Sequence, residues 1–244
     1  MDPVVSNLLT VLGIAFFAYF FGGIPTAVII GKLFYHKNPL EYGSHNSGGT
    51  NAGRVLGKKA GVLVITLDVL KTATVFWTTY AVINFTGLIE AAHLWNDGLL
   101  YNWMALFFAS LGHCFSPYLK GKGGKAVACL YGSVGGTSWV LFPLCFASFF
   151  LFFKLTKKVM SKASILTGAF LVFLEWVLCI VSLCLGGSFS SGILSWTFAL
   201  APGASLGWES ALSTTLVYLL LVIRHADNIR RIKNGSEKPL VWEK

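Results

Sequence analysis

The amino-acid sequence predicts an all-α protein, a polytopic transmembrane bundle of about seven helices that forms a single domain over residues 1–244. Three observations predict this fold class: an apolar composition, several long apolar runs, and a one-sided distribution of lysine and arginine. Of the 244 residues, 55% are hydrophobic and 12% are charged, and the mean hydropathy is +0.69. A soluble domain of this length needs more polar surface than this composition supplies.

Several apolar runs are long enough to cross the hydrocarbon core of a bilayer, which takes about 20 apolar residues in a helix. No lysine or arginine precedes the first of them, so we expect a retained first helix rather than a secretory signal, which needs a basic start. The predicted spans cover residues 8–30, 61–85, 99–115, 163–185, and a last stretch that begins near Leu206 and ends at Ile223.

Residues 124–155 are too long for one comfortable crossing, and the Gly-Gly-Thr at 135–137 predicts a turn in their middle. A single crossing would put the lysines of residues 154–162 on the opposite side from Lys120 and Lys122. Two crossings, with a short first helix, put every basic loop on one side. We therefore expect two helices here.

Charge then orients the bundle, because cytoplasmic loops of membrane proteins carry an excess of lysine and arginine. The seven-helix topology places the N-terminus outside and the C-terminus in the cytoplasm. The loops predicted to face outside carry no lysine or arginine, and their charged residues are Asp2, Glu90, Asp97 and Glu209.

Polar residues collect in the predicted cytoplasmic loops. The first loop, residues 43–54, mixes glycines with hydroxyl and amide side chains and ends in Arg54. Successive backbone N–H groups in such a loop can form an anion-binding nest, and a guanidinium can bind a phosphate through two hydrogen bonds. A flexible polar turn explains the loop, taken alone, equally well.

The second loop, residues 112–125, ends in Gly-Gly-Lys just before the short helix, which directs free N–H groups toward the loop. It contains no GxxxxGK[ST] motif, so nucleotide hydrolysis gains no support. The third polar segment directly follows the last span, and there His225, Asn228 and Ile232 share one face if the helix continues. Lysines and arginines at these places also serve as topology signals or contacts to lipid head groups.

Two features lie deeper in the predicted helices. Asp68 and Lys71 are three residues apart and can neutralise each other, so a structural ion pair is the favoured interpretation. Glu175 has no partner that the sequence identifies. Together the three loops indicate one or two anionic ligands at one membrane face, without naming the anion or a reaction.

The chain resembles the bacterial acyl-phosphate-dependent glycerol-3-phosphate acyltransferases, integral membrane enzymes with three polar cytoplasmic motifs. The first, Ser-x-Asn-x-Gly-x-Thr-Asn-x-x-Arg-x-x-Gly, is met by Ser44, Asn46, Gly48, Thr50, Asn51, Arg54 and Gly57. The second, His-x-Phe and then Lys-Gly-Gly-Lys-x-Val-Ala, is met by His113, Phe115, Lys122, Gly123, Gly124, Lys125, Val127 and Ala128. The third, Arg-His-x-x-Asn-Ile-x-Arg and then Gly-x-Glu, is met by Arg224, His225, Asn228, Ile229, Arg231, Gly235 and Glu237. Residues between these positions, such as His45 and Gly121, depart from the family pattern.

The resemblance implies transfer of a fatty acyl group from acyl phosphate to glycerol 3-phosphate, without a metal or a cofactor. It implies catalytic roles for Ser44, Arg54, Lys125, His225 and Asn228. It implies substrate-binding roles for Asn46, Gly48, Thr50, Asn51, His113, Lys122, Gly123, Gly124, Ser161, Arg224 and Arg231. The implied partners are the two substrates, membrane lipid and an enzyme that makes acyl phosphate; no nucleic acid is implied.

In the implied division of labour, Ser44, Thr50 and Asn51 hold the acyl-phosphate head. Arg54 and Lys125 bind the phosphate of glycerol 3-phosphate, while His225 and Asn228 orient its hydroxyl. A substrate phosphate oxygen would accept the proton, with His225 as the rival base. An unperturbed histidine titrates near pH 6.5, so we expect a flat pH profile between about pH 6 and 8 to count against it.

The main alternative is a transporter or channel for phosphorylated anions. Transporters commonly show inverted repeats and broken helices at the middle of the membrane. The sequence shows neither feature, and its polar clusters lie at one edge. The His-x4-Asp dyad of acyl-CoA-dependent acyltransferases is absent from the predicted cytoplasmic loops, which argues against an acyl-CoA donor.

Overall fold

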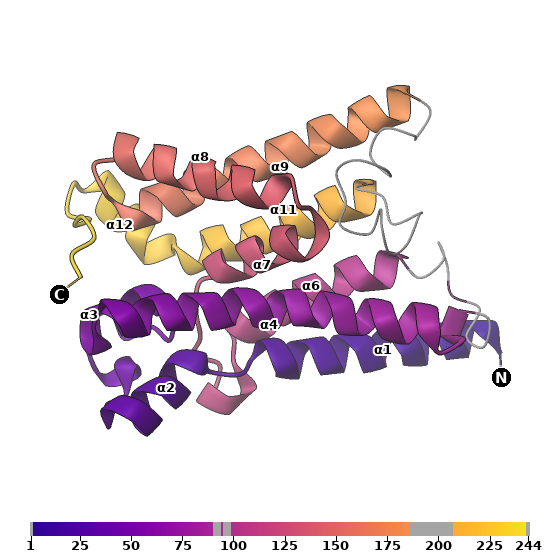
Figure 1. Cartoon of the computed structure of the whole chain (residues 1–244), viewed down its shortest axis with the longest axis horizontal. Coiled ribbons are helices and arrows are strands. Elements are labelled where there is room, and N and C mark those ends of the chain that lie inside the picture. Colours follow the sequence, from indigo (N-terminus) through magenta and orange to yellow (C-terminus); the bar gives the residue numbers. More distant parts are fainter. Residues whose placement is uncertain (1, 90–93, 95–98, 186–206, 243–244) are drawn as a thin grey trace.

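The computed structural model describes residues 2–89, 94, 99–185 and 207–242, and within these ranges every regular element is a helix (Figure 1). The α-helices are α1 (Pro3–Gly22), α2 (Thr26–Tyr35), α3 (Gly49–Leu56), α4 (Lys58–Phe85), α6 (Leu99–Cys114), α7 (Val127–Thr137), α8 (Leu141–Leu155), α9 (Met160–Cys184), α11 (Trp208–Arg224) and α12 (Ala226–Lys233). Two 3₁₀ turns, η1 (Pro39–Glu41) and η3 (Pro117–Leu119), lie in the loops.

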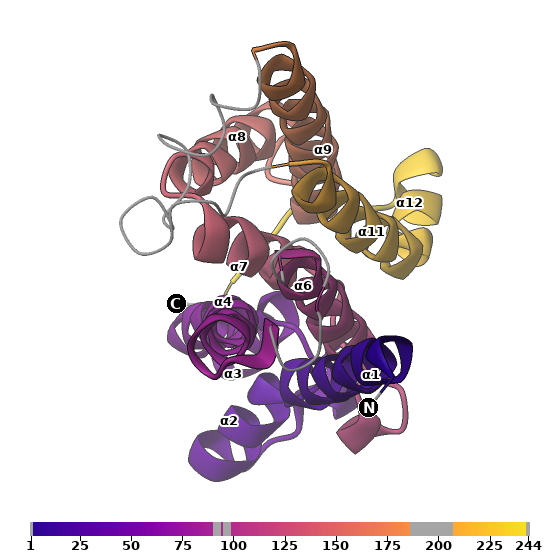
Figure 2. The ribbon, with the colours of Figure 1, turned by 90° about the vertical axis from the view of Figure 1, so that its right-hand side faces the viewer.

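The helices form two groups that lie lengthwise beside each other (Figures 1 and 2). Helices α1, α4 and α6 pack together in one group, and α8, α9 and α11 form the other. The short α7 lies between the groups, where it packs on α4 and α8, and α11 also contacts α6. The two ends of the chain lie at opposite ends of the bundle, with the short helices α3 and α12 at the C-terminal end (Figure 1).

The core is apolar and receives side chains from both groups. Phe76, Trp103, Leu130, Leu171 and Leu221 all belong to one buried cluster and come from five different helices. Large apolar side chains also cover the outside of the bundle, which suits contact with lipid rather than water. Among the described residues, three helical stretches are long and apolar enough to span a membrane: Pro3–Tyr35, Lys58–Phe85 and Met160–Cys184.

The first predicted span, residues 8–30, is wrong as one continuous helix. The chain breaks after α1 at residues 23–25, because Pro25 has no N–H and its ring would clash with a carbonyl of the preceding turn. Carbonyl groups of the break find other donors: Lys71 Nζ donates to the Ile24 carbonyl across 2.9 Å, and Ser116 Oγ donates to the Gly23 carbonyl across 2.6 Å. Side chains from α4 and the second loop therefore stabilise the break between α1 and α2.

The predicted division of residues 124–155 into two helices is confirmed, but the predicted turn is misplaced. Residues 135–137 form the last turn of α7, and the chain turns at residues 138–140. Gly135 and Gly136 provide space rather than a turn, since an added methyl group at Gly135 would lie 2.6 Å from the Phe142 ring. The remaining predicted spans correspond to α4, α6, α9 and α11.

The buried charges behave as the sequence indicated. Lys71 Nζ lies 2.7 Å from Asp68 Oδ1, and both side chains are at most 7% exposed. Thr26 Oγ1 also donates to Asp68, so the pair joins α2 to α4. Glu175 does find a partner, because Thr214 Oγ1 on α11 donates to its carboxylate across 3.0 Å.

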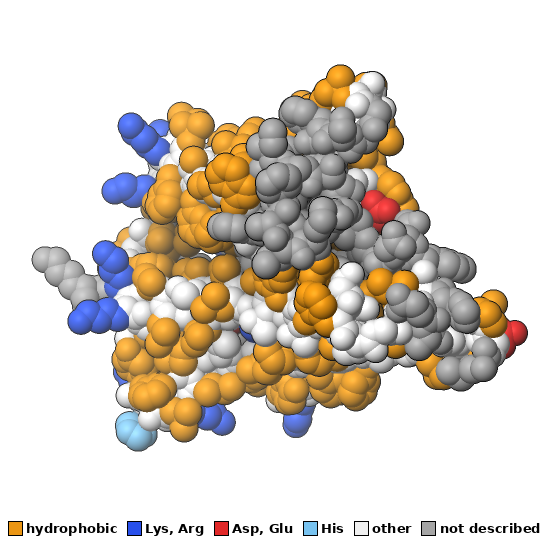
Figure 3. All heavy atoms as spheres, turned by 45° about the vertical axis from the view of Figure 1, so that its right-hand side comes forward, with side chains coloured by type: hydrophobic (Ala, Val, Ile, Leu, Met, Phe, Trp, Pro, Cys, Tyr) orange, Lys and Arg blue, Asp and Glu red, His pale blue; other side chains and the backbone are white. Residues whose placement is uncertain are grey.

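Most lysine and arginine side chains lie at one end of the molecule. In Figure 3 most lysine and arginine side chains gather at one end, whereas acidic side chains are visible at the other. The predicted outside residues Glu90 and Asp97 and the predicted helix start Leu206 lie outside the described residues.

Candidate active site

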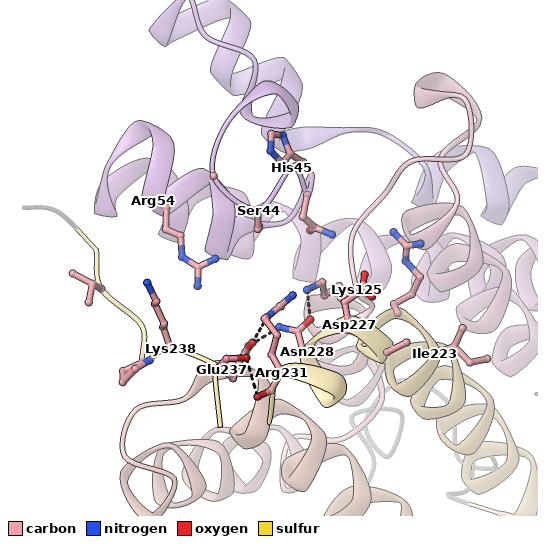
Figure 4. A pocket seen from close by; sticks show the side chains of 17 residues that line it. Ser44, His45, Arg54, Lys125, Ile223, Asp227, Asn228, Arg231, Glu237 and Lys238 are labelled. Carbon is pink, nitrogen blue, oxygen red and sulfur yellow. Dashed lines mark hydrogen bonds and ion pairs between the residues drawn. The ribbon is translucent and has the colours of Figure 1, made fainter. Parts of the chain in front are cut away.

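A cavity of about 910 Å³ opens at the basic end of the bundle (Figure 4). Its walls come from the first loop with α3, the end of the second loop at Lys125, the joint between α11 and α12, and the segment that follows α12. The lining residues are Gly43, Ser44, His45, Asn46, Arg54, Lys125, Ile223, Arg224, Ala226, Asp227, Asn228, Arg231, Ser236, Glu237, Lys238, Pro239 and Val241. Five of these side chains are cationic and two are carboxylates, so the cavity suits an anion.

The first loop is shaped by Asn51. Its side chain is 1% exposed, accepts a hydrogen bond from the Ser44 N–H across 2.7 Å, and donates to the carbonyls of Pro39, Tyr42 and Asn46. The predicted nest of free N–H groups is therefore wrong at Ser44, and also at Gly48, whose N–H donates to Asn46 Oδ1. A buried amide serves as the loop's framework, which leaves the Ser44 side chain and Arg54 to line the cavity.

The three polar segments meet at the carbonyl of Gly123. Asn46 Nδ2 from the first loop donates to this carbonyl across 3.1 Å, and Arg224 Nη2 at the end of α11 donates to it across 3.2 Å. Arg224 Nε also donates to the Gly124 carbonyl, and its guanidinium lies over the Phe115 ring, 5.2 Å from the centroid. This convergence fixes the backbone just before Lys125.

Hydrogen bonds connect a chain of polar side chains along one side of the cavity. Lys125 Nζ donates to Asn228 Oδ1 across 2.6 Å, and Asn228 Nδ2 donates to Glu237 Oε1 across 2.6 Å. Glu237 also accepts from Ser161 Oγ at 2.7 Å and from Arg231 Nε at 2.6 Å. Figure 4 shows this chain on one side of the cavity and Arg54 on the other. Glu237 thus holds one cation, one amide and one hydroxyl in place.

The same contacts shift two pKa values. Burial, followed by the positive charge of Arg231, lowers the pKa of Lys125 to about 8. Burial alone would raise the pKa of Glu237, but hydrogen bonds from Ser161, Asn228 and Arg231 outweigh it, and the pKa is lowered. Glu237 is therefore ionised at neutral pH, while Lys125 keeps its charge only below about pH 8.

His225 lies behind the cavity wall. It follows α11 and precedes α12, so the helix does not continue unbroken through this residue, and its side chain is 3% exposed. Its Nδ1 lies 2.8 Å from the Leu221 carbonyl, which can only accept, so Nδ1 carries the proton and Nε2 is an acceptor. Burial, opposed by this hydrogen bond, lowers the pKa of His225 to about 4. A flat profile between pH 6 and 8 therefore cannot count against His225 as a base.

The structure brings seven of the predicted site residues to the cavity: Ser44, Asn46, Arg54, Lys125, Arg224, Asn228 and Arg231. Ser161, Asn51, Gly123 and Gly124 support the lining residues through the hydrogen bonds described above. Gly48, Thr50, His113 and Lys122 do not line it. His113 instead lies beside a small second cavity, where its Nδ1 is 3.8 Å from Asp68 Oδ1.

Sequence reasoning assigned no substrate role to Glu237, although it completes the third motif, or to Lys238. The available signal was the Gly-x-Glu that ends the motif. What the spacing could not indicate is that Gly235, with a φ of +68°, turns the chain back over the cavity.

Comparisons with known proteins identify similar sequences and structures. A sequence model described as glycerol-3-phosphate acyltransferase matches residues 12–235. The glycerol-3-phosphate acyltransferase of Staphylococcus aureus (strain bovine RF122 / ET3-1) is 33% identical over 231 residues, which is 92% of this chain and 95% of the relative.

Two crystal structures are similar in fold. The glycerol 3-phosphate form of PlsY (YgiH), an integral membrane glycerol 3-phosphate acyltransferase, has a TM-score of 0.72 and 26% identity, covering 95% of this chain and 96% of the other. Its lysophosphatidic acid form gives a TM-score of 0.70 at 26% identity, with 94% of each chain covered. This chain is a multi-pass membrane protein, and it belongs to the glycerol-3-phosphate acyltransferase family.

Proposed function

We propose that this protein transfers a fatty acyl group from acyl phosphate to glycerol 3-phosphate, giving 1-acylglycerol 3-phosphate (lysophosphatidic acid) and inorganic phosphate. One observation carries the proposal: Arg54, Lys125, Arg224 and Lys238 line a single cavity at the basic end of the bundle, where the described residues offer them no ion-pair partner. Both substrates carry phosphate groups, and together they supply the missing negative charge. Such an enzyme would catalyse the first step of phospholipid synthesis.

The chemistry needs no nucleophile from the protein, because an acyl phosphate is an activated mixed anhydride. The hydroxyl oxygen of glycerol 3-phosphate attacks the acyl carbon, forming the new ester bond. The bond between that carbon and the bridging phosphate oxygen breaks, and phosphate leaves with the electron pair. The hydroxyl proton passes to a phosphate oxygen of a substrate, so atoms and charge balance.

The protein contributes position and electrostatic stabilisation, which can supply most of the rate enhancement in such a reaction. Arg54 and Lys125 lie on facing walls and bind the phosphate of glycerol 3-phosphate between them. Asn228, already bonded to Lys125, orients the attacking hydroxyl. Ser44 and Asn46, which line the cavity from the first loop, bind the acyl-phosphate head. Arg224 and Arg231 stabilise the negative charge that develops on the departing phosphate.

His225 supports this arrangement as a neutral residue. Its Nδ1 proton is held by the Leu221 carbonyl, and it fixes the joint from which α12 presents Asn228. With a pKa of about 4, it is a weak base at neutral pH, which favours the substrate phosphate as proton acceptor.

We further propose seven membrane crossings, with the N-terminus outside and the cavity facing the cytoplasm of a bacterial inner membrane. The one-ended distribution of basic side chains supports this orientation (Figure 3). A cytoplasmic cavity would also give access to glycerol 3-phosphate and to an enzyme that makes acyl phosphate.

The test uses the purified protein in lipid with radiolabelled glycerol 3-phosphate and either palmitoyl phosphate or palmitoyl-CoA. We expect labelled lysophosphatidic acid from palmitoyl phosphate alone, and its loss in Arg54→Ala. Arg230→Ala is the matched control, since the Arg230 side chain is 77% exposed and does not line the cavity. Product from palmitoyl-CoA at the same rate would refute the donor. No product from either donor, in folded protein, would refute the enzyme and make anion transport the next assay.

A further inference from the structure

The segment after α12, residues 236–242, is the tail segment, and it contributes five residues to the cavity wall. The family model ends at residue 235, and within the tail segment only Glu237 belongs to one of the three motifs. We propose that Lys238 is a phosphate-binding residue of the substrate site and that Trp242 is the positioning residue that holds the tail segment, and with it Lys238, over the cavity. This inference rests on the proposed function, because it assigns a substrate phosphate to Lys238.

The tail segment is fixed at both of its ends. Where it leaves α12, the N–H groups of Ser236 and Glu237 donate to the Arg231 carbonyl across 2.8 and 3.2 Å. Farther along, the Leu240 N–H donates to the Lys158 carbonyl, in the loop between α8 and α9, across 2.9 Å. These bonds tie the segment to the α8–α9 side of the cavity.

Trp242 ties the segment to the opposite side. Its indole Nε1 donates to the Thr50 carbonyl on α3 across 3.3 Å. The ring packs on Gly53 so closely that an added methyl group there would lie 2.5 Å from Trp242 Cε2. The tail segment therefore runs from α12 to α3 and forms part of the cavity wall between them (Figure 4).

Lys238 lies between these two anchors. It lines the cavity, and Figure 4 shows its side chain directed toward Arg54, which comes from α3. In the part of the chain that the structure describes, no carboxylate lies within ion-pair distance of Lys238, whereas the neighbouring Glu237 is already bonded to Arg231. Lys238 is exposed at the cavity, and an ammonium group near a guanidinium, with no carboxylate as counter-ion, can bind a doubly charged phosphate.

The phosphate could belong to glycerol 3-phosphate or to the acyl phosphate, and kinetics separate the two. We would measure KM for each substrate, with the other saturating, in wild type, Lys238→Ala and Lys238→Arg. We expect Lys238→Ala to raise KM for one substrate about tenfold with kcat nearly unchanged, which is the loss of one charge-assisted hydrogen bond. Lys238→Arg should restore most of the affinity. Lys233→Ala is the matched control, because Lys233 is exposed at the same end and does not line the cavity.

A double-variant cycle tests the positioning role of Trp242. We expect Trp242→Ala to raise the same KM as Lys238→Ala, and to add little in the Lys238→Ala background, because both changes remove the same contact. Additive effects would show that Trp242 does not act through Lys238. Unchanged KM values for both substrates in Lys238→Ala would overturn the phosphate-binding role.

Calorimetry of glycerol 3-phosphate binding to the purified protein keeps this inference separate from the proposed function. Weaker binding in Lys238→Ala than in Lys233→Ala would support the inference even if no acyl donor turned over. An active wild type whose Lys238→Ala variant binds and reacts normally would overturn the inference and leave the proposed function intact.

Discussion

Lys125 Nζ donates a hydrogen bond to Asn228 Oδ1 across 2.6 Å, although the two residues are 103 positions apart in the chain. The bond joins the end of the second loop, just before α7, to α12, and these two segments are far apart in the sequence. Asn228 Nδ2 in turn donates a hydrogen bond to Glu237 Oε1, which fixes the orientation of the Asn228 amide. The fixed amide determines where the Lys125 ammonium lies.

Replacing Asn228 by alanine should therefore impair catalysis more than folding. We expect Asn228→Ala to lower kcat/KM about 100-fold, the usual cost of removing one preorganised polar group from a reaction site. The measurement is lysophosphatidic acid formation from palmitoyl phosphate. Asn234→Ala, an exposed asparagine at the end of α12, should react normally. Equal rates in both variants would contradict the role given to Asn228.

The lowered pKa of Lys125 predicts a loss of affinity in alkaline solution. Below about pH 8 the ammonium is charged and binds phosphate; as the pH rises through about 8 the charge is lost, so kcat/KM for glycerol 3-phosphate should fall. The substrate phosphate is already fully ionised there, since its second pKa is about 6. Lys125→Arg keeps its charge at any accessible pH, and its profile should stay flat. An alkaline limb that persists in Lys125→Arg would assign the titration to another group.

His225 should give no inflection near pH 6.5. With a pKa of about 4 it is neutral throughout the neutral range, whether it orients the substrate or accepts a proton. Ionisation of the substrate phosphate can still produce a limb near pH 6, so wild type and His225→Gln must be compared. We expect the two limbs, measured as kcat/KM over acidic to neutral pH, to coincide. A limb present only in wild type would show that His225 titrates there.

The buried ion pair between Asp68 and Lys71 predicts that removing one charge destabilises the fold more than removing both. Asp68→Asn leaves the Lys71 ammonium buried without its counter-ion and should cost about 3–5 kcal/mol. The double variant Asp68→Asn/Lys71→Met removes both charges and should recover much of this loss. Thermal unfolding in detergent measures the difference. The control is Asp227→Asn, which breaks an exposed pair with Arg230 and should change stability little. Equal destabilisation by Asp68→Asn and Asp227→Asn would show that burial of the ion pair does not determine its effect on stability.

The sequence was sufficient to predict most helices, because apolar length alone specifies a membrane-spanning segment. The break at residues 23–25 was not predicted, because Ile24 and Pro25 do not interrupt the apolar run. Pro25 nevertheless ends the helical hydrogen bonding, since it has no backbone N–H. The carbonyl partners of the break, Lys71 and Ser116, lie far away in the chain and leave no local signal.

The sequence predicted which residues belong to the candidate site, but not the hydrogen bonds that connect them. Polar motifs at one membrane edge identified Arg54, Lys125 and Asn228, and all three line the cavity. Spacing could not separate a side chain that faces the cavity from one that shapes a loop, such as the buried Asn51. That distinction depends on which distant carbonyls each amide reaches in the folded chain.

The origin of the cavity walls has a consequence for biosynthesis. Arg54, Lys125 and Lys238 come from an early, a middle and a late part of the chain, yet they line the same cavity. A ribosome delivers the early and middle parts to the membrane long before residue 238 emerges. A growing chain can therefore place its early and middle helices before the wall of this cavity is complete, because Lys238 joins the wall only after the other two residues.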